Sequence, residues 1–193
     1  MIIFDSDDAG ADHVISNMCQ SADPRKYLDK LHIANPNFKA TLFTIPDEST
    51  IEFLEWCKAN GSWIEIAQHG FRHYSNYECE KMTYDEFDAW MTEQPRAEIL
   101  NKYFSMGFKS PGWQTSVAVF EWLRDHDFWV ADQHNNDDRR PKDLPVYIVG
   151  ENSIHTHVWN CVGNGIEETF DDILERIKDE TDFRFVSEVV NGN

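Results

Sequence analysis

The sequence predicts an α/β domain with a mostly parallel sheet. Short apolar runs that suit strands alternate along the chain with segments whose apolar residues recur at helical spacing. With 193 residues, 41% of them hydrophobic, the chain can build one sizeable core but is too short for two ordinary domains. We therefore expect residues 1–193 to form a single domain with about seven parallel strands.

The first third of the chain alternates between strands and helices. The apolar run at 2–4 predicts a strand that ends in an acidic cluster, and the apolar spacing at 24–32 predicts a helix. Residues 38–45, FKATLFTI, have the composition of a strand, and a helix is expected over 47–60. The signals for that second helix are a cap, an apolar stripe and a terminating glycine: Asp47 or Ser49, then Ile51, Leu54 and Cys57, then Gly61.

The middle of the chain continues the alternation. Residues 63–67, WIEIA, alternate between apolar and polar as a half-buried strand does. Thr83 and Glu86 have capping-box spacing, which predicts the start of a helix over 83–104. Pro95 lies inside this range, where it predicts a bend.

The last part of the chain begins with a short predicted strand at 108–111. Thr115 can cap the helix that follows, whose apolar face is Val119, Trp122 and Leu123. The remaining predicted elements are strands at 128–131, 146–149, 153–159 and 183–190, and an amphipathic helix at 166–178.

The composition argues against several classes of protein. The 17 basic and 35 acidic residues give a net charge of −18, and such a surface repels the phosphate backbone of nucleic acids. No run of about 18 apolar residues occurs, so we expect no membrane-spanning helix. The amino terminus lacks the basic start and long apolar stretch of a secretory signal, so we expect a cytoplasmic protein.

Chemically capable side chains follow or end several of the apolar runs. In α/β folds, ligands bind at the carboxyl ends of parallel strands, so these residues are expected to gather at one edge of the sheet. They are Asp5, Asp7 and Asp8; His69 and His73; Lys109, Pro111 and Trp113; Asp132; and His155, His157 and Trp159.

Two of these groups suggest a bound metal ion. If the chain turns helical at Gly70, His69 and His73 share one face about 6 Å apart, which suits two ligands of one divalent ion. The carboxylates of Asp7 and Asp8 are costly to crowd together unless a cation offsets their repulsion. The alternative interpretation is a pair of ordinary histidines beside a solvated acidic loop.

Taken together, these residues resemble the polysaccharide deacetylases of the NodB-homology type, carbohydrate esterase family 4 (CE4). The family's Asp-Asp motif matches Asp7 and Asp8, and its HxxxH motif matches His69 and His73. Its third motif resembles residues 108–113, FKSPGW, although a lysine stands where the family has arginine. The weaker matches are Trp129 and Asp132 for the fourth motif, and His155 and His157 for the fifth.

The resemblance implies a distorted (β/α) barrel with a mononuclear metal site. The implied metal ligands are Asp8, His69 and His73. The implied ion is zinc, with cobalt, nickel or manganese as alternatives. Asp7 is the implied general base and His157 the general acid, and His155 is the alternative to His157.

The implied reaction is metal-dependent hydrolysis of the N-acetyl amide of an amino sugar, oligosaccharide or polysaccharide, with release of acetate. The residues assigned to substrate binding are Lys109, Pro111, Trp113, Asp132, His155 and Trp159. Two alternatives stay open: hydrolysis of another C–N amide bond on the same scaffold, and a sugar-binding domain without catalytic activity. The sequence leaves the sugar and the oligomeric state open.

Overall fold

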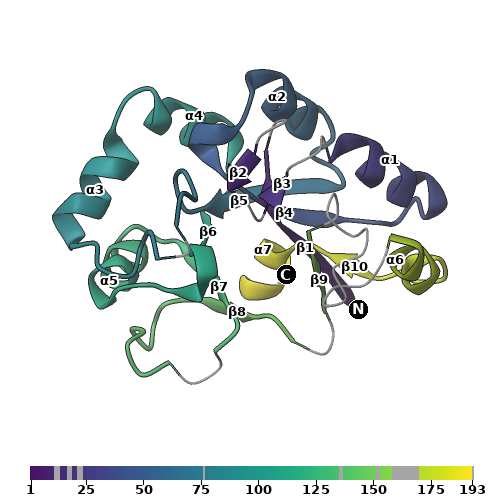
Figure 1. Ribbon diagram of the computed structural model, residues 1–193. Helices are drawn as coiled ribbons and strands as arrows, with labels where there is room; N and C mark the ends of the chain where they lie inside the picture. Colours follow the sequence, from purple (N-terminus) through teal and green to yellow (C-terminus); the bar gives the residue numbers. More distant parts are fainter. Residues whose placement is uncertain are drawn as a thin grey trace.

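One sheet of parallel strands forms the centre of the protein. The computed structural model describes residues 1–10, 14–16, 19–20, 24–75, 77–134, 137–150, 153–157 and 170–192. The strands of the sheet are β1 (Ile2–Ala9), β4 (Ala40–Thr44), β5 (Ile64–His69), β6 (Gly107–Lys109), β7 (Trp129–Asp132), β8 (Val146–Ile148), β9 (Ser153–Thr156) and β10 (Phe183–Arg184). Within the described residues their order is β10-β1-β4-β5-β6-β7-β8, and β9 pairs with β1 off this path. Every pair in this sheet is parallel, and the strands curl into an incomplete barrel (Figure 1).

Helices cover the outside of the curled sheet (Figure 1). They are α1 (Arg25–Ala34), α2 (Ile51–Ala59), α3 (Tyr84–Thr92), α4 (Arg96–Tyr103), α5 (Val117–Asp125) and α6 (Phe170–Ile177). The short helix α7 (Val186–Val190) differs, because it lies in the middle of the ring of strands. The remaining elements are the 3-10 helices η1 (Pro46–Glu48) and η2 (Pro111–Trp113) and an antiparallel pair, β2 (Val14–Ser16) with β3 (Cys19–Gln20).

The inside of the barrel is packed with side chains, and α7 closes one end of it. Val186 of α7 belongs to a buried cluster with Phe43 and Tyr147, which point inward from the strands. The backbone N–H of Val186 donates to Thr41 Oγ1, 3.0 Å away, near the beginning of β4. Because α7 occupies the amino ends of the strands, the carboxyl ends are the side left for a functional site.

The structure confirms the predicted fold class and corrects some element boundaries. The helix predicted over 83–104 is two helices, α3 and α4, because Pro95 has no N–H to donate and its ring clashes with the preceding turn. The Thr83–Glu86 capping box is confirmed. The strand predicted at 183–190 is only the two residues of β10 before α7 begins, so tertiary docking outweighs the strand propensity of its valines.

The predicted caps of the other two helices, α2 and α5, were wrong by one residue or more. Thr50 caps α2 by accepting from the N–H of Phe53, whereas the carboxylate of Asp47 is held by Arg96. Ser116, rather than Thr115, caps α5 by accepting from the N–H of Val119. Ile51 is 53% exposed and lies off the buried stripe of α2, which consists of Phe53, Leu54 and Cys57.

Parts of two predicted elements fall on residues that the structure does not describe. These parts are the end of the strand at 153–159, which includes Trp159, and the beginning of the helix at 166–178. Among the described residues, none of the helices has both the length and the apolar character needed to cross a membrane.

Candidate metal centre

A bulge in β1 brings two neighbouring carboxylates to one side of the strand. Asp7 and Asp8 lie within β1 rather than after it, because the strand continues to Ala9. The pairing of β1 with β4 shifts register between Ser6 and Ala9, and Asp8 has φ 54°. In a regular strand adjacent side chains face opposite ways, and a bulge re-aims one of them. Both carboxylates therefore approach His69, with Oδ1 of Asp8 3.4 Å and Oδ2 of Asp7 4.0 Å from its Nε2.

The two histidines are brought together by a loop and not by the helical turn that we expected. His69 ends β5, and Gly70 and His73 have φ 56° and 53°. Glu78 holds the loop, because its carboxylate accepts from the N–H groups of Phe71 and Arg72 at 2.8 and 3.1 Å. The imidazole rings of His69 and His73 end up 4.9 Å apart between centroids.

Glycine is required at position 70 by both conformation and space. A Cβ atom there would lie 2.3 Å from Glu78 Oε2 and 2.6 Å from Pro111 Cγ. The positive φ is also one that other residues adopt only with strain. Gly70 therefore allows the chain to reverse directly after β5 and brings His73 next to His69.

Three donor atoms converge on one point at the carboxyl end of the barrel. Asp8 Oδ1 lies 3.4 Å from Nε2 of His69 and 3.4 Å from Nε2 of His73. Ligands bound tetrahedrally at about 2.0–2.1 Å are separated by about 3.3–3.4 Å, which follows from the geometry of zinc sites. Asp8 Oδ1 is buried and accepts no hydrogen bond from the described residues, so the set fits a divalent ion.

The surroundings prepare these ligands for metal binding. His69 Nδ1 lies 3.0 Å from the carbonyl oxygen of Lys109, and donating there leaves Nε2 free to bind a metal. Burial and the nearby His69 lower the pKa of His73, which favours the neutral imidazole that ligation needs. Burial opposes the charge of Asp8, but the facing imidazoles of His157 and His69 outweigh it and lower the pKa of this carboxyl.

A buried lysine supports the second carboxylate. Lys109 is 0% exposed, and its Nζ donates to Oδ1 of Asp7 at 2.6 Å and to Oδ1 of Asp5 at 3.3 Å. Burial alone would raise the pKa of Asp7, but the Lys109 ammonium, with help from neighbouring histidines, holds it well below its ordinary value. Asp5, Asp7 and His155 also have the spacing of a metal site, but the ammonium group already stands among them.

The two histidines of the fifth motif contact different carboxylates. In the pairing of β1 with β9, Asp5 lies opposite His155, and Asp5 Oδ1 is 2.6 Å from His155 Nδ1. That hydrogen bond puts the proton on Nδ1 and leaves His155 Nε2 3.8 Å from Oδ2 of Asp7. His157 Nε2 lies 3.3 Å from Oδ2 of Asp8, on the side of the predicted metal ligand.

The remaining predicted residues are placed differently. Trp113 lies beside Lys109 and His155, with its ring centroid 4.2 Å from Lys109 Nζ and 5.6 Å from the His155 ring. Pro111 is buried in η2 and packs against Gly70. Asp132 ends β7 but bonds with Arg140 at 3.2 Å and accepts from the N–H of His134.

The sequence pattern places Asp5 among the polar residues at the strand ends but assigns it no role. The structure makes it the fully buried partner of His155 and Lys109. The alternation of side chains along a strand could have identified Asp5, because Asp5 and Asp7 are two residues apart in β1 and face the same side. Glu78 carried no comparable signal, since its role depends on how the loop folds.

Comparison with known proteins identifies the fold. No family model and no curated protein sequence matches this chain. One similar structure is a family 4 acetyl xylan esterase from Clostridium thermocellum, solved with a cobalt ion. It superposes with TM-score 0.63 and 18% identity, and the match covers 98% of this chain and 90% of the esterase. A peptidoglycan N-acetylglucosamine deacetylase gives TM-score 0.60 and 18% identity, covering 97% and 86%.

One similar structure is of another kind. A pseudoenzyme of the CE4 family from Bacillus anthracis gives TM-score 0.57 and 12% identity, covering 98% of this chain and 65% of its own. The same fold therefore occurs in proteins named as an esterase and a deacetylase and in one named as a pseudoenzyme. The sequence-based resemblance is confirmed at the level of the fold: this chain folds as a family 4 carbohydrate esterase does.

Proposed function

We propose that the protein is a metal-dependent deacetylase that hydrolyses the N-acetyl amide of an amino sugar within an oligo- or polysaccharide and releases acetate. The observation that carries the proposal is the buried Asp8 Oδ1, which has no hydrogen-bond donor among the described residues and lies 3.4 Å from one nitrogen of each of two histidines. A second carboxylate, Asp7, stands next to this set and can act as a base. Ligands, a base and an acid are thus all within one buried cluster.

The metal-binding residues in this proposal are Asp8, His69 and His73. Two imidazoles and one carboxylate suit zinc, and cobalt, nickel or manganese can occupy such a set. Three protein ligands leave positions for water and substrate, as a catalytic site requires. A divalent ion bound there supplies a Lewis acid for the attacking water and for the amide carbonyl.

Asp7 is the residue proposed to take the proton of the attacking water. Its Oδ1 is occupied by the Lys109 ammonium, so Oδ2 is the oxygen that faces His69 and the metal position. The lysine keeps this carboxyl ionised and occupies Oδ1, which leaves Oδ2 as the oxygen that can accept a proton. Lys109 is therefore assigned to positioning the base rather than to contacting substrate.

His155 is proposed as the acid that protonates the departing amine, in place of His157. Asp5 orients the His155 ring through Nδ1, so its Nε2 is directed towards Asp7 and the reacting region. An imidazole held through one nitrogen and exposed to the reaction through the other is the arrangement of a general acid or base. His157 contacts the ligand Asp8 instead, and we assign it to holding that carboxylate.

The test is acetate release by the metal-loaded protein. N-acetylated chito-oligosaccharides are the primary substrates, and acetylated xylan tests an ester on the same scaffold, since one similar structure is an acetyl xylan esterase. We expect release from the amide substrates, loss with a chelator and recovery on adding zinc or cobalt. Asp7→Asn should remove turnover while retaining the metal, and the exposed Asp29→Asn serves as the matched control.

The alternative of an inactive sugar-binding domain has one observation in its favour, because the family's arginine is replaced by Lys109. A protein that binds one metal ion per chain but releases no acetate from any substrate would support that alternative. A protein that binds no metal even after zinc is added, with His69→Ala as the comparison, would remove the basis of the proposed function.

A further inference from the structure

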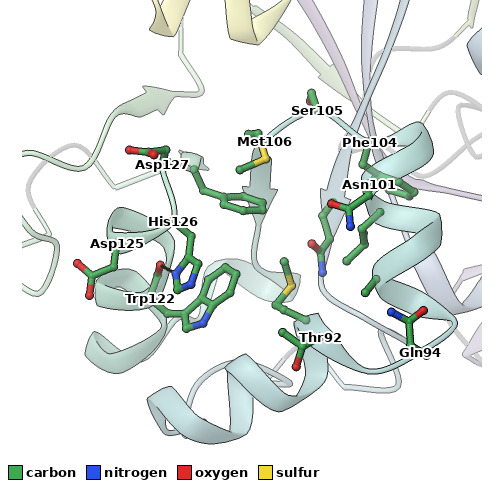
Figure 2. A pocket seen from close by; sticks show the side chains of 15 residues that line it. Thr92, Gln94, Asn101, Phe104, Ser105, Met106, Trp122, Asp125, His126 and Asp127 are labelled. Atoms are coloured by element: carbon green, nitrogen blue, oxygen red, sulfur yellow. Dashed lines mark hydrogen bonds between the residues drawn. The ribbon is translucent and has the colours of Figure 1, made fainter.

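A cavity lies on the outer side of the sheet, away from the metal centre. It measures about 720 Å³ and is lined by residues of β5, α3, α4 and α5 and of the segments that precede β6 and β7 (Figure 2). Gln68 lines this cavity, and its neighbour His69 belongs to the metal centre. Since adjacent residues of a strand face opposite sides, the cavity and the metal centre lie on opposite faces of β5.

The volume and lining of this cavity are those of a site for a small organic molecule. Ligand pockets commonly measure about 300–1,000 Å³ and combine apolar walls with a few polar groups. Its apolar wall is formed by Met91, Ala97, Leu100, Phe104, Trp122 and Phe128. Figure 2 shows Trp122 and His126 together on one side of the cavity and Asn101 on the other.

Among the described residues the lining contains no lysine or arginine, and one of its two carboxylates, Asp125, is already paired with Arg124 at 2.7 Å. Asp127 is exposed at the rim and forms no ion pair with any residue in the described part of the chain. His126 Nδ1 lies 2.8 Å from the Trp122 carbonyl oxygen, and donating there leaves Nε2 as an acceptor in the neutral ring. These groups favour an occupant that carries hydrogen-bond donors and positive charge.

Gln68 adds an unpaired hydrogen-bond acceptor to the lining of the cavity. It is 1% exposed, and its Nε2 donates to the Gly70 carbonyl oxygen at 3.0 Å, which fixes the orientation of the amide. Its Oε1 is buried and has no hydrogen-bond partner among the described residues. An unpaired buried acceptor costs free energy, which a donor in the adjoining cavity would recover.

We propose that this cavity is a binding site for an amphiphilic organic cation, with an ammonium group at Asp127 and a hydrophobic body against Leu100 and Trp122. The apolar wall selects the body, and the carboxylate of Asp127, which has no ion-pair partner among the described residues, selects the charge. This site is separate from the proposed deacetylase chemistry, and its occupancy can be tested on the metal-free protein.

The test uses 3-phenylpropylammonium as the probe in isothermal titration calorimetry. Two control compounds separate the contributions: 3-phenylpropanoate has the same skeleton with opposite charge, and propylammonium has the charge without the ring. We expect saturable binding of one probe per chain and no saturable binding of either control. The second control matters because a chain of net charge −18 attracts any small cation.

Variants locate the binding. Leu100→Trp fills the cavity and is expected to abolish binding, and Ala97→Leu, one turn earlier on α4, should weaken it. Asp127→Asn should weaken binding about two- to fivefold, the range for one partly exposed ion pair. Glu98→Gln removes one exposed charge from α4 outside the cavity lining and should leave the affinity unchanged. Circular dichroism and thermal unfolding check that each variant is folded.

Three results would overturn the proposal. One is the absence of saturable probe binding to the wild-type protein. Another is equal affinity for 3-phenylpropanoate, since it would mean that the rim does not select charge. The third is unchanged binding in both Leu100→Trp and Ala97→Leu when these variants are folded, because the probe would then occupy another surface.

Discussion

Replacing Lys109 with methionine tests the buried charge cluster most directly. The Lys109 ammonium has no solvent exposure and lies 2.6 Å from an oxygen of Asp7 and 3.3 Å from one of Asp5. At an effective dielectric constant of about 20, these attractions amount to about 6 kcal/mol for Asp7 and about 5 kcal/mol for Asp5. Much of this attraction compensates for removing the charges from water. The net loss of unfolding free energy expected for Lys109→Met is therefore about 3–5 kcal/mol, as for other buried pairs that lose one partner.

The size of this loss should depend on pH. In the wild-type protein the folded pKa of Asp7 lies below its unfolded value, so its contribution is present above about pH 4 and is lost as the pH falls through the folded pKa. Without the ammonium, burial and the carboxylate of Asp5 raise the pKa of Asp7. The Asp7 carboxylate then takes up a proton as the pH falls, so the penalty of Lys109→Met should be smaller at pH 5 than at pH 7.

The assay is urea unfolding of the metal-free protein at pH 7 and pH 5, with Lys109→Arg as the variant that keeps the charge. A loss below about 1 kcal/mol at pH 7, the value for an exposed pair, would refute the reasoning. Equal losses at the two pH values would refute the assignment of the penalty to unpaired carboxylates. A Lys109→Arg protein as unstable as Lys109→Met would show that shape rather than charge matters here.

Three further predictions concern residues outside the charge cluster. Glu78→Ala should weaken zinc binding about tenfold, because the loop that carries His73 loses both of its hydrogen bonds to Glu78. Competition with a chromophoric chelator measures the zinc affinity, and an unchanged affinity would contradict the prediction. Thr83→Ala should lower the unfolding free energy by about 1 kcal/mol in urea titration without altering zinc affinity, since it removes only the cap of α3. Glu65→Gln should raise the unfolding free energy at pH 7 and leave it unchanged at pH 3. Burial raises the pKa of Glu65, so its charged form destabilises the fold only at a pH above the folded pKa. Equal changes in unfolding free energy at pH 7 and pH 3 would count against this prediction.

Much of the candidate site could be read from the sequence because its residues occur at the ends of recognisable strands. The sequence pattern indicates the two histidines, the Asp-Asp pair and the lysine of FKSPGW. In a parallel sheet, strand ends that are far apart in sequence meet at one edge, so periodicity alone brings such residues together. The structure places Asp8 beside His69 and Asp7 beside Lys109.

Other features depended on interactions that no local pattern contains. Whether Asp47 caps a helix or binds Arg96 is decided by a residue 49 positions away. The role of Asp5 depends on which residue of β9 lies opposite it, and that register placed His155 there. The valine-rich segment of α7 is helical because Val186, Val189 and Val190 pack against apolar residues of the sheet at one end of the barrel.

The sequence by itself determined the class of fold and the chemical types gathered at the carboxyl end of the sheet, because both follow from periodicity and from the order of strands. Only the tertiary structure decided which histidine faces which carboxylate. Hydrogen bonds and ion pairs act over about 3 Å, so one residue of register or one bulge changes the partner. The bulge at Asp8 and the positive φ at Gly70 set the final positions of the side chains and bring Asp8, His69 and His73 to one point.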